Sequence, residues 1–176
     1  MGVVGEIFLK FNPFAQKDIT TWLIDRGIEV VPPLMTDFFM QSFVNMKVNQ
    51  DSHIKKKYIP DFAIDWLYGK VQKQIDKINK IGKAFLYFQP FENIYEKAEK
   101  AKQVISLNTQ FGEGWLIAGE MSSFASQGIN HVISLQPFGC IANHIVEKGI
   151  EKRIKSVYPQ ICLLYTSPSP RDGLLS

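Results

Sequence analysis

The sequence predicts an α/β fold, in which a parallel Rossmann-like sheet carries a largely helical insertion. Three observations support this prediction: a strand, a helix and a strand follow one another at the start, residues 34–127 carry helical patterns, and a strand and a helix come after them. Strand–helix–strand units are typical of parallel sheets with right-handed crossovers. The chain has 176 residues, 45% of them hydrophobic and 21% charged, which is typical of one soluble globular domain.

The first strand–helix–strand unit is expected within the first 31 residues. Residues 3–11 are apolar and partly β-branched and end at an Asn-Pro pair, so we expect a buried strand that runs into a turn. Residues 17–26 place apolar side chains at helical spacing, and Gly27 supplies a common helix ending. Residues 28–31 then form a second strand, which two prolines stop.

Several helices separated by helix breakers are expected over residues 34–127. The longest covers residues 62–81, and its apolar stripe consists of Trp66, Leu67, Val71, Ile75, Ile78 and Ile81. Residues 91–107 form another helix, with Pro90 at a plausible first position. The helix over residues 115–127 ends at Gly128.

The α/β pattern resumes with a strand over residues 131–135 and a turn over residues 136–140. A helix follows, whose predicted buried stripe consists of Ile141, Ile145, Val146, Ile150, Ile154 and Val157. Its predicted solvated side consists of Glu147, Lys148, Glu151, Lys152 and Lys155. Another strand begins near Ile161 and is expected to be interrupted there.

The end of the chain differs from the rest. Residues 162–172 resemble the translation of a transposase adaptor used in sequencing libraries, and two Ser-Pro pairs break helix and strand alike. We therefore predict that residues 1–161 form a truncated α/β domain and that residues 162–176 are an adaptor-derived tail.

Charge and cysteine content limit the function classes. The net charge of +3 is too small to indicate a nucleic-acid or membrane partner. Two cysteines cannot form a disulfide framework, and no leader pattern opens the chain, so a cytoplasmic location is expected.

Candidate site residues gather in the turns that follow two predicted strands. Ligands of open parallel sheets bind beyond the carboxyl ends of the strands, where the strand order reverses. If the first strand lies between residues 28–31 and 131–135, that point lies between Asn12 and the turn that contains Gln136 and Gly139.

Cys140 is the most specific candidate in this turn. At the start of a helix, partial positive charge stabilises a thiolate, which can act as nucleophile, redox thiol or iron–sulfur ligand. The alternative is a small buried apolar residue. His144 is four residues further along the same helical face and could donate to the thiolate, or it could be a boundary residue without chemistry.

Two weaker candidates lie in the helical insertion. Gly112 and Gly114 precede a helix, where exposed amides could bind an anion, although no Walker or dinucleotide pattern is present. Glu120 shares a helix face with Leu116 and Phe124 and could be a proton donor, although a structural acceptor is favoured.

Three segments together resemble the carboxyl-terminal part of the acyl-CoA dehydratase activase-related proteins, relatives of the 2-hydroxyacyl-CoA dehydratase subunits. These segments are residues 5–14, residues 112–121 and residues 136–145. The resemblance implies a dehydratase-subunit-like α/β domain in a large anaerobic protein. In that group, a cysteine-bound 4Fe–4S cluster takes part in ATP-driven electron transfer for dehydration of 2-hydroxyacyl-CoA.

By this resemblance, Cys140 is one cluster ligand, and the other ligands come from upstream domains or from a dehydratase or activator partner. The fragment alone is not expected to turn over. Two alternatives stay open: a non-catalytic interaction domain on the same scaffold, and an α/β domain that binds acyl-CoA or a nucleotide.

Overall fold

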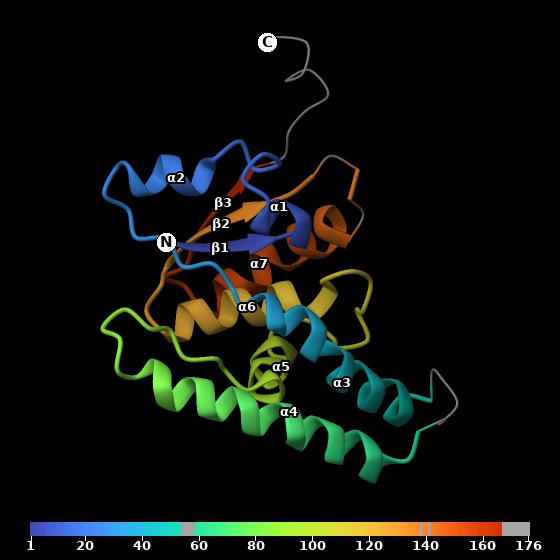
Figure 1. Ribbon diagram of the computed structural model, residues 1–176. Helices are drawn as coiled ribbons and strands as arrows, with labels where there is room; N and C mark the ends of the chain where they lie inside the picture. Colours follow the sequence, from blue (N-terminus) through green and yellow to red (C-terminus); the bar gives the residue numbers. More distant parts are fainter. Residues whose placement is uncertain (54–58, 138, 141, 167–176) are drawn as a thin grey trace.

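A small parallel sheet is the centre of the computed structural model (Figure 1), which describes residues 1–53, 59–137, 139–140 and 142–166. The strands β1 (Gly2–Gly5), β2 (His131–Leu135) and β3 (Cys162–Thr166) lie in the order β1-β2-β3, and both pairings are parallel. Val31 adds a parallel bridge to Gly2 on the free side of β1. The predicted neighbours of the first strand are therefore confirmed, although residues 28–31 contribute a bridge instead of a full strand.

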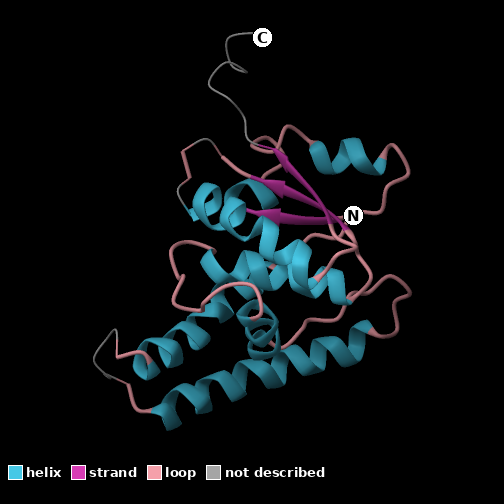
Figure 2. Ribbon diagram, turned by 180° about the vertical axis from the view of Figure 1, so that it is seen from behind, coloured by secondary structure: helices cyan, strands magenta, loops and turns pink. Residues whose placement is uncertain are grey.

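The two faces of the sheet pack against different helices. Val3 and Ile133 face the side of α2 (Ile19–Ile24), whereas Val4 and Val132 pack into the main core. The main core is built around α6 (Gly114–Ser126), which contacts β1 and the helices that precede and follow it in the chain. Figures 1 and 2 show α2 on one side of the sheet and α6 on the other.

The first predicted strand is too long. β1 ends at Gly5, and α1 (Ile7–Phe11) occupies the rest of the predicted segment. Gly5 has a φ of 117°, and a Cβ there would lie 2.2 Å from the carbonyl oxygen of Leu135. Glu6 then caps the helix, since its side chain accepts a hydrogen bond from the Leu9 amide.

The middle of the chain is helical, as predicted. It contains α3 (Met35–Asp51), α4 (Asp61–Gly82), α5 (Ile94–Lys102) and α6. Pro90 does not open a helix, because Asn93 caps α5 by accepting from the Tyr95 amide at 2.9 Å. No described helix combines the length and apolar character that a bilayer span needs.

The predicted apolar stripe of α4 is wrong for most of its members. Trp66, Leu67, Ile78 and Ile81 are exposed, whereas Ile75 is buried and Val71 half-buried. The inward face of α4 also contains Ile64 and Tyr68, which lie on the same side of the helix as Val71 and Ile75. Several apolar residues of α4 therefore face outward.

A π-helix changes the predicted pattern after β2. η1 (Ala142–Glu147) precedes α7 (Lys148–Val157), and Ile145 is 67% exposed whereas Glu147 is fully buried. Hydrogen bonds from i to i+5 place more residues in each turn, which shifts the faces of the helix. Val146, Ile150 and Ile154 are buried as predicted, and Ile141 lies outside the described residues.

The run after Ile161 completes the sheet. β3 pairs with β2 along its whole length, so the folded unit extends to Thr166. Leu163 and Tyr165 are half-buried, whereas Cys162 and Leu164 are exposed, as expected for an edge strand with one covered face. The adaptor origin of residues 162–176 stays a prediction.

Candidate functional site

The carboxyl edge of the sheet brings together chain segments that are far apart in sequence. Gly5 and Leu135 end β1 and β2 and are partners in the parallel ladder. The chain leaves Gly5 through α1 toward Asn12, and it leaves Leu135 through Gln136 toward Cys140. Because β1 and β2 are parallel, both connections start from the same edge of the sheet (Figure 1), as predicted.

Cys140 lies at this edge, just before η1. Its side chain is half-buried and forms no disulfide. Its carbonyl oxygen accepts from the His144 amide at 2.9 Å, so Cys140 stands at the start of the helix, as predicted. Gly139, with a φ of 80°, makes the turn that precedes it.

His144 and Asn12 also contact the main chain. The His144 Nδ1 atom lies 3.1 Å from the Cys140 carbonyl oxygen, which places the ring against the backbone of the turn. The Asn12 Oδ1 atom accepts from the Ala15 amide, three residues further along the chain, at 3.1 Å. These contacts hold the two connections in shape.

A buried acidic group lies behind the Cys140 turn. Gln136 is fully buried, and its Nε2 group donates to Glu147 Oε2. Burial raises the pKa of Glu147 from 4.5 to about 7, although hydrogen bonds from Ser134 and Gln136 lower it. Glu147 can therefore hold or release a proton near neutral pH. The α-helical pattern predicts Glu147 on the solvated side of its helix, and this prediction is wrong because the π-helix shifts the faces and buries Glu147.

The same region contains further buried polar atoms. Neither amide atom of Asn143 has a hydrogen-bond partner among the described residues, and the same is true of Gln136 Oε1 and Glu147 Oε1. Buried amide groups normally have partners, from protein or from ordered water. These side chains, which come from the segments next to the Cys140 turn, therefore contain polar atoms that could form further hydrogen bonds.

Glu120 has a structural partner that sequence reasoning missed. The Lys10 ammonium group lies 3.0 Å from Glu120 Oε1 and 3.2 Å from Glu120 Oε2, and both side chains are buried. Burial raises the pKa of Glu120, whereas Lys10 and Lys97 lower it. Lys97 in turn binds Asp37. The structural interpretation of Glu120 therefore agrees with the geometry, and the missed signal was a lysine within a segment predicted as a strand.

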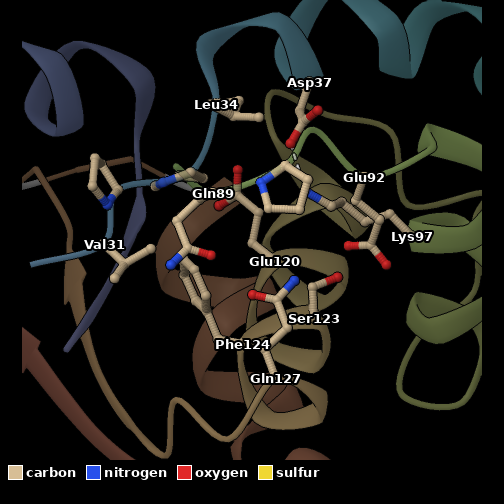
Figure 3. Close-up of a pocket in the computed structure, with 13 residues that line it drawn as sticks. Val31, Leu34, Asp37, Gln89, Glu92, Lys97, Glu120, Ser123, Phe124 and Gln127 are labelled. Atoms are coloured by element: carbon tan, nitrogen blue, oxygen red, sulfur yellow. Dashed lines mark hydrogen bonds and ion pairs between the residues drawn. The ribbon is translucent and has the colours of Figure 1, made fainter. Parts of the chain in front are cut away.

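A small cleft lies beside this network, between the start of α3 and helices α5 and α6 (Figure 3). Its volume is about 50 Å³, room for one or two water molecules. Asp37, Glu92, Lys97, Glu120 and Ser123 line it. Val31 also lines the cleft and pairs with Gly2, so the cleft lies toward the amino end of β1, away from the Cys140 turn.

The loop before α6 does not offer the expected anion site. The amides of Gly114 and Trp115 donate to the carbonyls of Phe111 and Thr109 at 2.9 and 2.8 Å, and the Leu116 amide donates to the Glu113 carbonyl. The buried Glu113 carboxylate accepts from the Ile7 amide at 2.7 Å. Gly112 and Gly114, with φ values of 58° and 32°, shape this loop so that it contacts α1.

The described residues could supply only one ligand, Cys140, to a metal centre at this edge of the sheet. Among the described residues, no group of three or more His, Cys, Asp and Glu side chains is arranged to hold a metal ion. Cys140 therefore supplies at most one bond to a metal cluster from this part of the chain.

Comparison with family models, curated proteins and solved structures finds no match for this chain.

Proposed function

We propose that this chain is the α/β domain of an iron–sulfur electron-transfer protein of the 2-hydroxyacyl-CoA dehydratase and activase group. In this proposal Cys140 supplies one ligand of a 4Fe–4S cluster. The supporting observation is that Cys140 is half-buried, not enclosed in the core, and follows β2 at the edge where parallel sheets bind ligands.

The other cluster ligands come from upstream domains of the same polypeptide or from a dehydratase or activator partner. This follows from chemistry, because one thiolate cannot hold a cluster. When bound, the cluster would pass single electrons in the ATP-driven dehydration of a 2-hydroxyacyl-CoA. The site is then shared between domains, and this domain alone does not turn over. A reducing cytoplasm without oxygen suits such a cluster.

The residues around Cys140 have defined tasks in this proposal. Gly139 makes the turn that presents the cysteine at the start of the helix. His144 and Asn12 fix the two connections through their main-chain contacts. Gln136 anchors the beginning of the turn by its hydrogen bond to Glu147.

Anaerobic reconstitution of the complete parent polypeptide with iron and sulfide tests this proposal. Cys140→Ala should lower the bound iron and the visible absorption of the cluster. His131→Ala is the matched control, because His131 is an exposed residue of a metal-ligating type that begins β2, at the opposite end of the strand from the Cys140 turn. Equal iron content and absorption in all three proteins would remove the ligand role and favour the interaction-domain alternative.

The acyl-CoA or nucleotide alternative has a separate readout. A ligand that binds the folded domain raises its melting temperature. If acyl-CoA or ATP stabilises the wild-type chain and the Cys140→Ala variant equally, binding is independent of the cysteine. The occupied amides at Gly114 and Trp115 argue against the predicted anion loop as that binding site.

A further inference from the structure

One face of α4 and the turn after it expose an unusual number of large apolar side chains. We call this surface the α4 face. Its apolar members, with exposed fractions between 47% and 88%, are Phe62, Trp66, Leu67, Ile78, Ile81, Phe85, Leu86 and Tyr87. They gather at the two ends of α4, and large groups of exposed apolar side chains mark interaction sites in soluble proteins.

The α4 face points away from the rest of the described chain. α4 packs inward through Ile64 and Ile75, and Tyr68 makes edge-to-face ring contacts with Phe43 and Tyr95. Figures 1 and 2 show α4 as the outermost helix, on the far side of α5 and α6 from the sheet. The outward face is therefore free to lie against something large and flat.

The charges of α4 are separated between two sides of the helix. At about 100° per residue, Lys70, Lys73, Lys77 and Lys80 fall in the same outward arc as Phe62, Trp66 and Ile81, and all four lysines are exposed. Asp61 and Asp65 fall outside this arc, and Asp65 is paired with Lys47, whereas the exposed Asp76 borders the arc beside Lys80. The four lysines therefore outnumber the single aspartate at the border of the outward arc.

We propose that the α4 face binds the surface of an anionic lipid bilayer. Exposed apolar side chains can enter the acyl boundary of a bilayer, and the long stems of neighbouring lysines let their ammonium groups reach anionic headgroups. Phe85, Leu86 and Tyr87 would enter deepest, since they are 68%, 88% and 83% exposed. The proposal is independent of Cys140, and it differs from the expectation of no membrane partner.

A second copy of the chain fits this surface less well. In a two-fold symmetric contact each face meets itself, so four lysines would lie opposite the same four lysines. Like charges that face one another oppose association. An anionic lipid surface instead complements both the lysines and the apolar residues.

Co-sedimentation of the full chain with vesicles tests the proposal. We expect binding to phosphatidylcholine vesicles that contain phosphatidylserine, little binding to pure phosphatidylcholine, and weaker binding as salt rises. The double variant Lys73→Gln, Lys77→Gln should bind roughly 30-fold more weakly, on the typical contribution of a lysine near an anionic surface.

A second variant tests the apolar part of the surface. Phe85→Ser with Leu86→Ser should also reduce vesicle binding, whereas Phe14→Ser, which removes a 91% exposed side chain elsewhere, should not. Because all these positions are exposed, unchanged circular-dichroism melting shows that each variant folds. The proposal is wrong if the wild type binds neither vesicle, binds both equally, or binds equally well in all variants. It is also wrong if light scattering shows a dimer that the serine pair dissociates.

Discussion

Each of the two buried lysines among the described residues is paired with one buried carboxylate. Lys10 and Glu120 are 110 positions apart in sequence, and their side chains are only 3% and 1% exposed. Removing each ion from water costs several kcal/mol, which their mutual attraction offsets only while both are present. Lys97 and Asp37 form a second buried pair nearby. The pair of Lys10 and Glu120 therefore ties α1 to α6 and so fixes the chain that leaves β1.

Breaking this pair on one side should be costly. We expect Lys10→Met to lower the free energy of unfolding by about 3 kcal/mol, because Glu120 stays buried without its main partner. Adding Glu120→Gln should recover part of that loss, since the uncompensated charge is then removed. Urea unfolding of the two single variants and the double variant measures this coupling. Strictly additive losses would contradict the assigned pairing.

Glu147 should make stability depend on pH. Its pKa is raised from 4.5 to about 7, mainly by burial, so the folded state holds a proton that the unfolded state releases between these values. Its contribution to stability is therefore full below about pH 4.5 and is lost as pH rises through 7, by about 3 kcal/mol in total. The Glu147→Gln variant, whose side chain resembles a protonated glutamate and does not titrate, should not show this loss of stability between pH 4.5 and 7.

Urea unfolding at pH 5 and pH 8 checks this prediction, and Glu151→Gln in the following helix α7 is the control. A nearby lysine, Lys155, lowers the pKa of Glu151, so its replacement should leave the loss of stability toward pH 8 in place. If wild type and Glu147→Gln lose the same stability between the two pH values, Glu147 does not carry the extra proton.

The helices and turns differ in how much their glycines matter. In α4, Gly69 has open space where a Cβ would be placed, so alanine there meets no neighbour. At the end of β1, a Cβ on Gly5 would clash with the backbone of Leu135, and its φ of 117° disfavours other residues. Gly69 therefore only weakens helix α4, whereas Gly5 allows the chain to turn from β1 into α1.

We expect opposite effects of alanine at these two positions. Gly69→Ala should stabilise the protein by about 1 kcal/mol through helix propensity. Gly5→Ala should destabilise it by about 3 kcal/mol or prevent folding, through strain and the clash. Thermal unfolding of both variants measures this. Equal and small effects would mean that the β1–α1 turn is placed wrongly.

The sequence patterns predicted the positions of helices and strands better than they predicted which side of each helix is buried. β2 has the predicted bounds, because its β-branched residues are flanked by clear breaks. The end of β1 was missed because an apolar run of 3–11 hides the glycine and the capping Glu6 that start α1. Cys140 and Gln136 could be placed at the site because they follow a predicted strand. Glu147 could not, since a π-helix has no simple sequence signal.

At the scale of the whole molecule, helix α6 separates two candidate surfaces. On one side, the sheet brings the segments after β1 and β2 to a common edge with Cys140. On the other side, α5 and α3 carry α4, whose outward face is apolar and basic. Because the core lies between the two surfaces, a cluster partner and a lipid surface could both be bound at once.

The most direct test of the proposed function is the electron paramagnetic resonance spectrum of the reconstituted parent polypeptide after reduction by dithionite. Three proteins are compared: wild type, Cys140→Ser and His131→Ala. We predict a reduced 4Fe–4S signal in the wild type and in His131→Ala, and a lost or altered signal in Cys140→Ser, because Cys140 would be an iron ligand whereas His131 begins β2 at the other end of the strand. The same spectrum from all three proteins, or no cluster in any of them, would contradict the assignment.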